Sequence, residues 1–219
     1  FGDLVITEVM LNPLAVTDAN GEWFELYNTT AFDIDLNGWT LRDDDFDVHL
    51  IGSSVVVPAG DYAVLCRNAS FASNGGVDCD YQYANFSLSN GEDEIYVVNP
   101  SGGDADSVVY DGSYPVTNGA SLILDPAQVT AVANNAVGNW CISTLPFGAG
   151  DFGTPGVINE PDLDGDGERL CEGDCDDSDP AINTSAVEVC DGIDNDCDGV
   201  ADDGLDLDGD GDGFNSLTS

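Results

Sequence analysis

Carboxylates at every second position are the feature of this sequence that most clearly points to chemistry. Three strings of the form Asp-x-Asp-x-Asp-Gly lie in the last third of the chain: Asp162/Asp164/Asp166, Asp194/Asp196/Asp198 and Asp206/Asp208/Asp210. Calcium takes six to eight hard oxygen ligands, and alternate carboxylates wrap around one ion where the chain turns sharply. The glycine at the sixth position of each string permits that turn. The spacing predicts calcium-binding loops, with two to four ions in all.

These loops differ from EF-hands. An EF-hand has an apolar helix on each side and a Glu at position twelve, whereas the three strings have Gly173, Leu205 and Leu217 there, without flanking helical patterns. We expect Asp174 or Asp177 to complete the first loop, and Asp202 or Asp203 the second. The predicted metal ligands are Asp162, Asp164, Asp166, Glu168, Asp174, Asp176, Asp177, Asp191, Asp194, Asp196, Asp198, Asp202, Asp203, Asp206, Asp208, Asp210 and Asp212.

Four of the seven cysteines are interleaved with these carboxylates: Cys171, Cys175, Cys190 and Cys197. Their Cys-x3-Cys and Cys-x6-Cys spacings fit zinc sites poorly, and the surrounding hard oxygens favour calcium, which leaves the cysteines to form disulfides. Four cysteines allow three pairings, among which spacing does not choose. A segment so poor in apolar residues must take its stability from crosslinks and bound ions.

The other three cysteines belong to the first 160 residues. Cys66 and Cys79 flank a polar loop and are predicted to pair. Three fates are open to Cys141: a free thiol, a bond to the acidic segment, or a bond to another copy of the chain.

The charge of the chain is strongly negative. Forty-three acidic residues face three arginines and no lysine, which gives a formal charge of -40. Such a chain repels nucleic acid and anionic lipid, so these partners are excluded. Residues 1–160 hold 23 acidic residues and residues 161–219 hold 20. This concentration favours metal ligands in the tail, while adaptation to high salt is an alternative for the excess in the first 160 residues.

Several features predict a secreted, extracellular protein of the cell surface. Seven cysteines indicate an oxidising compartment. The chain begins with Phe1, as a mature protein does after removal of a signal peptide. No apolar run approaches the roughly 20 residues that cross a bilayer.

The elements that must carry these loops are short strands. Runs that have period two or are short and continuously apolar, rich in β-branched and aromatic residues and bounded by turn residues, lie at 4–10, 23–27, 55–57, 62–65, 95–98 and 121–124. Helical periodicity is nearly absent. The pattern predicts an all-β fold, an antiparallel sandwich or barrel.

Residues 21–28 (GEWFELYN) and 33–43 (DIDLNGWTLRD) resemble the lamin-tail domain. Further matches follow in order at 57–65, 88–95 and 106–110, so that the resemblance covers about residues 2–158. It implies an antiparallel immunoglobulin-like β-sandwich. In bacteria and archaea such domains occur on exported proteins, beside enzymes or surface modules, without a catalytic role of their own; fold alone does not fix function.

Residues 171–183 (CEGDCDDSDPAIN) and 188–199 (EVCDGIDNDCDG) are similar to the MopE-type Asp/Cys-rich metal-binding repeat. One departure is Thr184-Ser185, where a Pro-Gly is usual. A flexible acidic linker, the alternative interpretation, would need neither the regular spacing nor the cysteines. The string at 162–167 recurs 44 residues later. We expect a sandwich at 1–158, a loop-rich repeat stabilised by disulfides and calcium at 159–204, and the truncated start of a second repeat at 205–219.

Catalysis is not expected. His49 is the only histidine, and no Gly-x-Ser-x-Gly motif is present. Glu22 and Glu25 flank Trp23 in a strand whose conformation is set by packing. The acidic run 43–47 predicts a hairpin loop, with an additional calcium site as an alternative.

These features predict a non-enzymatic extracellular calcium-binding module with a structural or adhesive role. The expected partners are further copies of the chain, in a surface array or filament, or other surface proteins. A second hypothesis is an accessory segment, for targeting or spacing, of a secreted hydrolase whose catalytic domain is elsewhere. A third is a sandwich that binds a glycan or a peptide.

Overall fold

The computed structural model of the protein describes residues 1–160 and 162–204. The chain divides into two compact units, Phe1–Pro161 and Asp162–Ser219. The predicted start of a second repeat, residues 205–219, lies outside the described residues.

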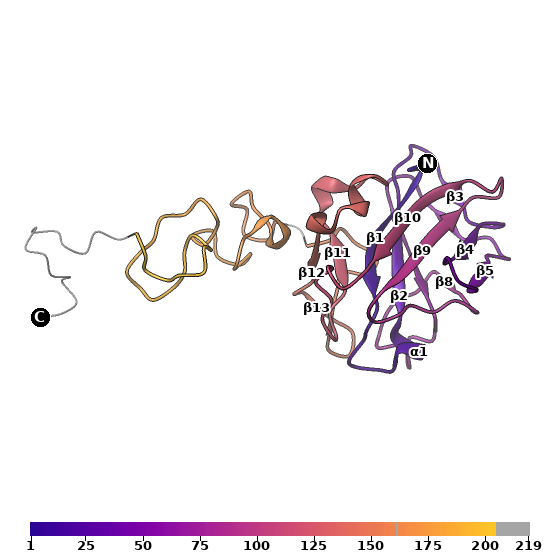
Figure 1. The fold of residues 1–219 in the computed structure, drawn as a ribbon, viewed down its shortest axis with the longest axis horizontal. Coiled ribbons are helices and arrows are strands. Elements are labelled where there is room, and N and C mark those ends of the chain that lie inside the picture. Colours follow the sequence, from indigo (N-terminus) through magenta and orange to yellow (C-terminus); the bar gives the residue numbers. More distant parts are fainter. Residues whose placement is uncertain (161, 205–219) are drawn as a thin grey trace, which may run out of the picture. The chain divides into compact units, whose positions relative to one another are not determined.

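The first unit contains a six-stranded sheet (Figure 1). Its strands, in spatial order, are β12 (Trp140–Ile142), β11 (Leu122–Leu124), β1 (Leu4–Met10), β2 (Trp23–Asn28), β7 (Tyr62–Cys66) and β8 (Tyr81–Gln82). Neighbouring strands are antiparallel except β7 and β8, which are parallel. All seven residues of β1 are buried, as expected for a strand in the middle of a covered sheet.

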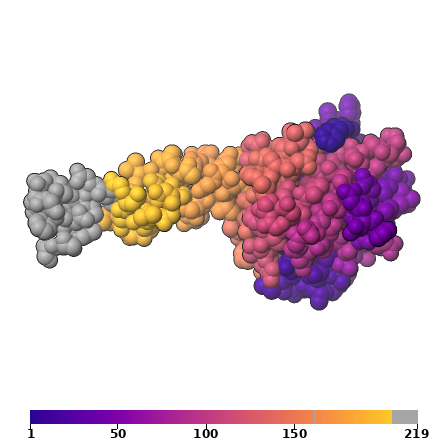
Figure 2. Space-filling model, viewed as in Figure 1, coloured from indigo at the N-terminus to yellow at the C-terminus, as the bar shows by residue number. Residues whose placement is uncertain are grey.

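A four-stranded antiparallel sheet lies against it, in the order β10 (Asp104–Tyr110), β9 (Asp93–Val98), β4 (Thr40–Arg42) and β5 (Val48–Leu50). Chain segments distant in sequence thereby become neighbours, as where β4 pairs with β9. On the surface of this unit, purple residues from the first quarter of the chain lie beside magenta residues from near position 100 (Figure 2). Two small antiparallel pairs complete the strands: β3 (Ile34–Asp35) with β6 (Val56–Val57), and β13 (Pro146–Phe147) with β14 (Asp151–Phe152).

Among the described residues, helical structure is confined to single turns. These are α1 (Asp18–Gly21) and the 3-10 helices η1 (Pro126–Gln128), η2 (Ala133–Asn135), η3 (Val137–Asn139) and, in the second unit, η4 (Leu170–Glu172).

One apolar core lies between the two sheets. It includes Leu4, Phe24 and Leu26 of the larger sheet and Leu41 and Ile95 of the smaller one. This shared core confirms the predicted immunoglobulin-like β-sandwich. A smaller apolar cluster around Trp23 and Val64 includes Cys66, and the predicted Cys66–Cys79 disulfide is present.

The second unit has very little apolar core. Ile182 is the one apolar side chain that is buried among residues 162–204. The chain is held instead by carboxylates that accept backbone N–H groups and by the disulfide Cys175–Cys197. Cys141 and Cys171 are also disulfide-bonded, and Cys190 is an exposed free thiol. The expected loop-rich, disulfide-stapled repeat is therefore present.

Candidate metal centre

The first aspartate string folds into a tight loop around the side chain of Asp162. Its Oδ1 accepts the N–H of Gly165 at 2.7 Å and its Oδ2 that of Gly167 at 3.1 Å. Both glycines have positive φ, +82° and +101°, which an L side chain rarely adopts. Asp164 Oδ1 in turn accepts the N–H of Asp166. The sequence thus turns the chain so that alternate carboxylates gather on one side.

Two later aspartates join this loop. Carboxylate oxygens of Asp164, Asp166 and Asp174 lie within 4.8 Å of one another, and so do those of Asp162, Asp164 and Asp177. Asp177 Oδ1 also accepts the N–H of Leu163 at 3.2 Å, which fixes it beside the string. We call these five carboxylates the first cluster.

The second string repeats the geometry of the first. Asp194 Oδ2 accepts the N–H of Gly199, five residues on, at 2.8 Å, as Asp162 Oδ2 does from Gly167. Gly199 also has a positive φ, +94°. Oxygens of Asp194, Asp196 and Asp198 lie within 4.8 Å of one another.

A further group, Glu188, Asp196 and Asp203, meets the same distance. Together with Asp194 and Asp198 they are the second cluster. Glu188 is absent from the ligands predicted above, because it precedes its string whereas distal ligands were sought after it. Its carboxylate accepts the N–H groups of Asn195 at 2.6 Å and Asp196 at 3.1 Å, and also that of Asp202. The signal for this residue was its place inside the second cysteine-containing stretch of the repeat.

Unpartnered buried oxygens test whether these residues fit a cation. Asp164 Oδ2, Asp166 Oδ2, Asp174 Oδ2 and Asp196 Oδ1 are buried without a hydrogen-bond partner. Asp174 is only 2% exposed. Leaving such an oxygen unsatisfied costs at least about 1–3 kcal/mol, and more for a charged group. A hard divalent cation is the ligand that this all-oxygen donor set suits.

The electrostatics agree with this. Burial, followed by the charges of Asp166, Asp177 and Asp164, raises the pKa of Asp174. Desolvation, followed by the charges of Asp198, Asp196, Glu188 and Asp194, raises the pKa of Asp203. Each cluster is therefore a place where negative charges repel one another, and a bound cation would reverse that repulsion.

Four other predicted ligands hold turns together. Glu168 accepts the backbone and hydroxyl donors of Thr184. Asp176 caps Ser178, Asp191 caps Ile193, and Asp202 accepts the N–H groups of Asp191 and Gly192. Among the described residues, none of these four carboxylates belongs to a group of three with metal-ligand spacing. Asp206, Asp208, Asp210 and Asp212 lie outside the described residues.

The Cys175–Cys197 disulfide connects the two clusters. Cys175 directly follows Asp174, and Cys197 lies between Asp196 and Asp198. The backbone N–H of Cys175 also donates to Cys197 Sγ at 3.1 Å. In a segment with very little apolar core, this crosslink sets where carboxylates distant in sequence lie.

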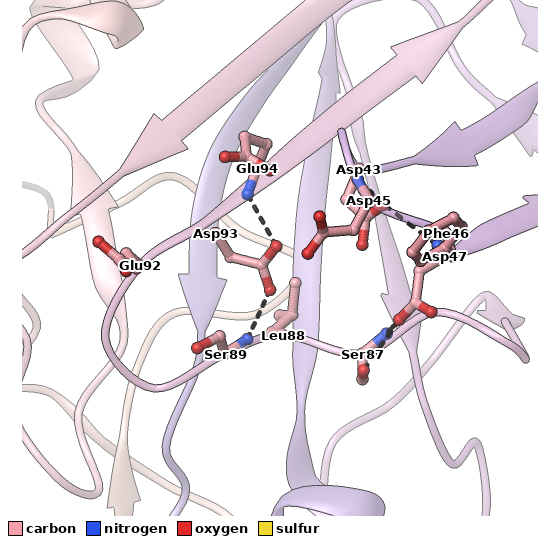
Figure 3. Close-up of a pocket in the computed structure, with 10 residues that line it drawn as sticks. All are labelled: Asp43, Asp45, Phe46, Asp47, Ser87, Leu88, Ser89, Glu92, Asp93 and Glu94. Carbon is pink, nitrogen blue, oxygen red and sulfur yellow. Dashed lines mark hydrogen bonds between the residues drawn. The ribbon is translucent and has the colours of Figure 1, made fainter.

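An acidic pocket of about 570 Å³ lies on the sandwich, between the β4–β5 loop and the segment 87–94 (Figure 3). The loop confirms the hairpin predicted at 43–47. Three of the carboxylates that line the pocket are engaged: Asp43 accepts two backbone N–H groups, Asp47 accepts two donors of Ser87, and Asp93 accepts the N–H groups of Ser89 and Glu94. No group of three metal ligands includes this loop among the described residues.

The side chains considered for catalysis have structural roles. Both oxygens of Glu22 accept from Arg67 Nη1 at 2.9 Å, and one also accepts the N–H of Leu88. His49 Nδ1 accepts the N–H of Ala84 at 3.2 Å, and its Nε2 lies 2.9 Å from the Tyr81 hydroxyl. Burial lowers the pKa of His49.

Two family models match the chain, one within each of its two compact units. The family model of the Lamin Tail Domain matches residues 1–112. A MopE-type model, described as "Putative metal-binding motif", matches residues 174–203. Both are domains of non-catalytic types. No curated protein matches the chain. Within the described residues, no helix has the length and apolar character needed to cross a membrane.

Proposed function

The chain belongs to the lamin tail domain family, and we propose that it is a non-enzymatic extracellular module whose Asp/Cys-rich repeat is folded by calcium. The sandwich is the rigid unit, and the repeat is a connector that calcium stiffens. The observation that carries this proposal is the set of buried, unpartnered carboxylate oxygens on Asp164, Asp166 and Asp174.

Calcium suits these clusters better than other metals. Copper and zinc favour imidazole, thiolate or thioether ligands. The single histidine contacts Tyr81 and Ala84 in the sandwich, and the single methionine, Met10, is buried there. Magnesium requires near-ideal octahedral geometry and keeps most of its water, whereas calcium accepts many carboxylates in flexible geometry.

How the repeat is stabilised supports an extracellular, structural role. Disulfides persist in oxidising compartments, and extracellular calcium is abundant enough to fill sites of modest affinity. A unit with almost no apolar core folds when cations neutralise its carboxylates and is loose without them. The proposed role is a structural or adhesive subunit at the cell surface, with other copies or other surface proteins as partners.

Hydrogen exchange of the oxidised full chain tests this proposal. With calcium, the amides of Gly165, Gly167 and Gly199 become protected, because cation binding holds the loops closed. The same concentration of magnesium, at equal ionic strength, gives much weaker protection. The matched variant Asp174→Asn loses protection in residues 162–177 and keeps it in the sandwich. Equal exchange with calcium and with EDTA would refute the proposal.

A further inference from the structure

We propose that each carboxylate cluster binds two divalent cations that share one bridging aspartate, Asp164 in the first cluster and Asp196 in the second. This inference rests on the proposed function, since it concerns the same repeat. It adds the number of ions and assigns a distinct role to one residue of each cluster.

The geometry of the groups carries the inference. Calcium lies about 2.4 Å from its ligands, so two oxygens on one ion are at most about 4.8 Å apart. The first cluster satisfies this limit as two triads, Asp162/Asp164/Asp177 and Asp164/Asp166/Asp174. Among the described residues no single group unites all five carboxylates. Asp164 is the only residue that the two triads share.

The second cluster has the same arrangement. Its triads are Glu188/Asp196/Asp203 and Asp194/Asp196/Asp198, and they share only Asp196. Asp164 and Asp196 occupy the same place, the third position of their strings. Two loops with different flanking sequences thus have the same arrangement, in which two triads share the aspartate at the third position of the string.

The free oxygens are where a bridge needs them. Asp164 Oδ1 accepts the N–H of Asp166, and its Oδ2 is buried without a partner. Asp196 has a buried, unpartnered oxygen as well. A carboxylate has about four lone-pair sites, so it can accept an N–H and still contact two cations. In the triad Asp164/Asp166/Asp174, Asp174 is almost completely buried and has an unpartnered oxygen of its own.

Charge also favours two ions over one. Each cluster holds five carboxylates. One divalent cation would leave a net charge of -3 on the cluster, and two would leave -1. Uncompensated charges are costly in a partly desolvated site. Pairs of cations about 3.5–4 Å apart are a known arrangement in proteins.

The triad Glu188/Asp196/Asp203 of the second cluster has room for a hydrated ion. Glu188, Asp196 and Asp203 line a cavity of about 250 Å³ together with Ala186, Val187 and Gly204. Each water takes about 30 Å³ of liquid volume, so the cavity can supply the water ligands that three carboxylates leave open.

Native mass spectrometry of the calcium-loaded, oxidised full chain tests the sharing. Asp164→Asn is expected to lose two ions, and its matched control Asp177→Asn one. Asp196→Asn is likewise expected to lose two, and its control Asp203→Asn one. Differences between variants are used because any ions bound by the third predicted string, outside the described residues, would be the same in every variant. Each variant should keep the ions of the other cluster, which reports that the repeat is still folded.

Equal losses from Asp164→Asn and Asp177→Asn would overturn the bridging assignment while leaving calcium binding intact. A wild-type chain that binds no calcium would instead overturn the proposed function itself. Anomalous diffraction from calcium in the wild-type protein is a second measurement that needs no variant. Paired peaks about 4 Å apart are expected, and one peak in each cluster would contradict the inference.

Discussion

Two buried glutamates, Glu8 and Glu25, lie directly opposite each other on strands β1 and β2. Glu8 accepts from the hydroxyl of Ser121 and from the backbone and hydroxyl of Thr154. Glu25 accepts from Thr7 Oγ1 and from the N–H of Gly156, both at 2.7 Å. The pair therefore fastens the segment 154–156 to the centre of the larger sheet.

This pair makes the stability of the sandwich depend on pH. Burial raises the pKa of Glu8 from 4.5 to about 7. Burial, followed by the charge of Glu8, raises the pKa of Glu25 well above its usual value. A raised folded-state pKa means that the folded protein holds the proton more tightly than the unfolded chain. The stabilisation is thus complete below about pH 4.5 and is lost as the pH rises through about 7.

Glu8→Gln is expected to flatten this dependence. Glutamine has nearly the same shape, keeps one acceptor oxygen and does not ionise. At pH 8 the variant should exceed the wild type in unfolding free energy by on the order of 1–3 kcal/mol, with a smaller difference at pH 5. Urea unfolding followed by tryptophan fluorescence measures this in the sandwich alone, because Trp23, Trp39 and Trp140 all belong to that unit. Parallel pH profiles for the two proteins would contradict the assignment.

At the scale of single residues, the sequence predicts those features that depend on spacing within a short segment. Alternate aspartates and their glycine define a loop within six residues, and Asp174 and Asp177 follow the first string closely enough to be considered with it. The partner of Glu8 depends on strand register and on the irregularity between Ile6 and Glu8, which no local pattern reveals. Glu188 reaches its cluster through a turn stabilised by Asn195 and Asp202.

The elements differ in how they are held together. The sandwich has a large apolar core, and the Cys66–Cys79 disulfide closes a short loop at its surface. In the repeat, Cys175–Cys197 spans 22 residues and joins segments that carry ligands of both clusters. The same kind of bond therefore supports an existing fold in one unit and largely defines the fold in the other.

Removing the two disulfides should have different effects on calcium. Cys175→Ser/Cys197→Ser is expected to weaken calcium binding about tenfold or more. A crosslink of this span reduces the conformational entropy of the unfolded state and so raises its free energy by roughly 3 kcal/mol. Cys66→Ser/Cys79→Ser, the matched control, should lower the melting temperature of the sandwich and leave calcium affinity unchanged. Titration calorimetry measures the calcium affinity of both variants, and thermal unfolding gives the melting temperature. Every protein carries Cys190→Ser to prevent thiol exchange. Unchanged affinity in the first variant would show that the ligands do not need the staple.

Strands β1, β2, β6, β7, β9 and β11 were predictable as short runs that are apolar or have period two, but the order of the strands in the sheets was not predictable. The position of β11 between β1 and β12, and the parallel contact of β7 with β8, are set by long-range packing. Short apolar runs show that a residue is buried without showing which strand lies beside it.

At the scale of the whole molecule, each of the three arginines already forms an ion pair within the chain. Arg42 pairs with Asp44 and Asp104, Arg67 with Glu22, and Arg169 with Glu172. The chain has no lysine and a formal charge of -40. One copy therefore has no free basic side chain to offer to the acidic surface of another, so contact between copies needs neutralisation from outside the chain.

Calcium is the expected neutraliser, and self-association should depend on it. Sedimentation velocity of the Cys190→Ser chain, which cannot crosslink through that thiol, should give a sedimentation coefficient that rises with protein concentration in calcium. In EDTA with sodium chloride at the same ionic strength it should stay constant, because monovalent ions screen charge without bridging carboxylates. Association in both solutions would assign the contact to ordinary screening. Monomers in both would exclude further copies as the partner and leave other surface proteins, which must then supply the basic groups that this chain lacks.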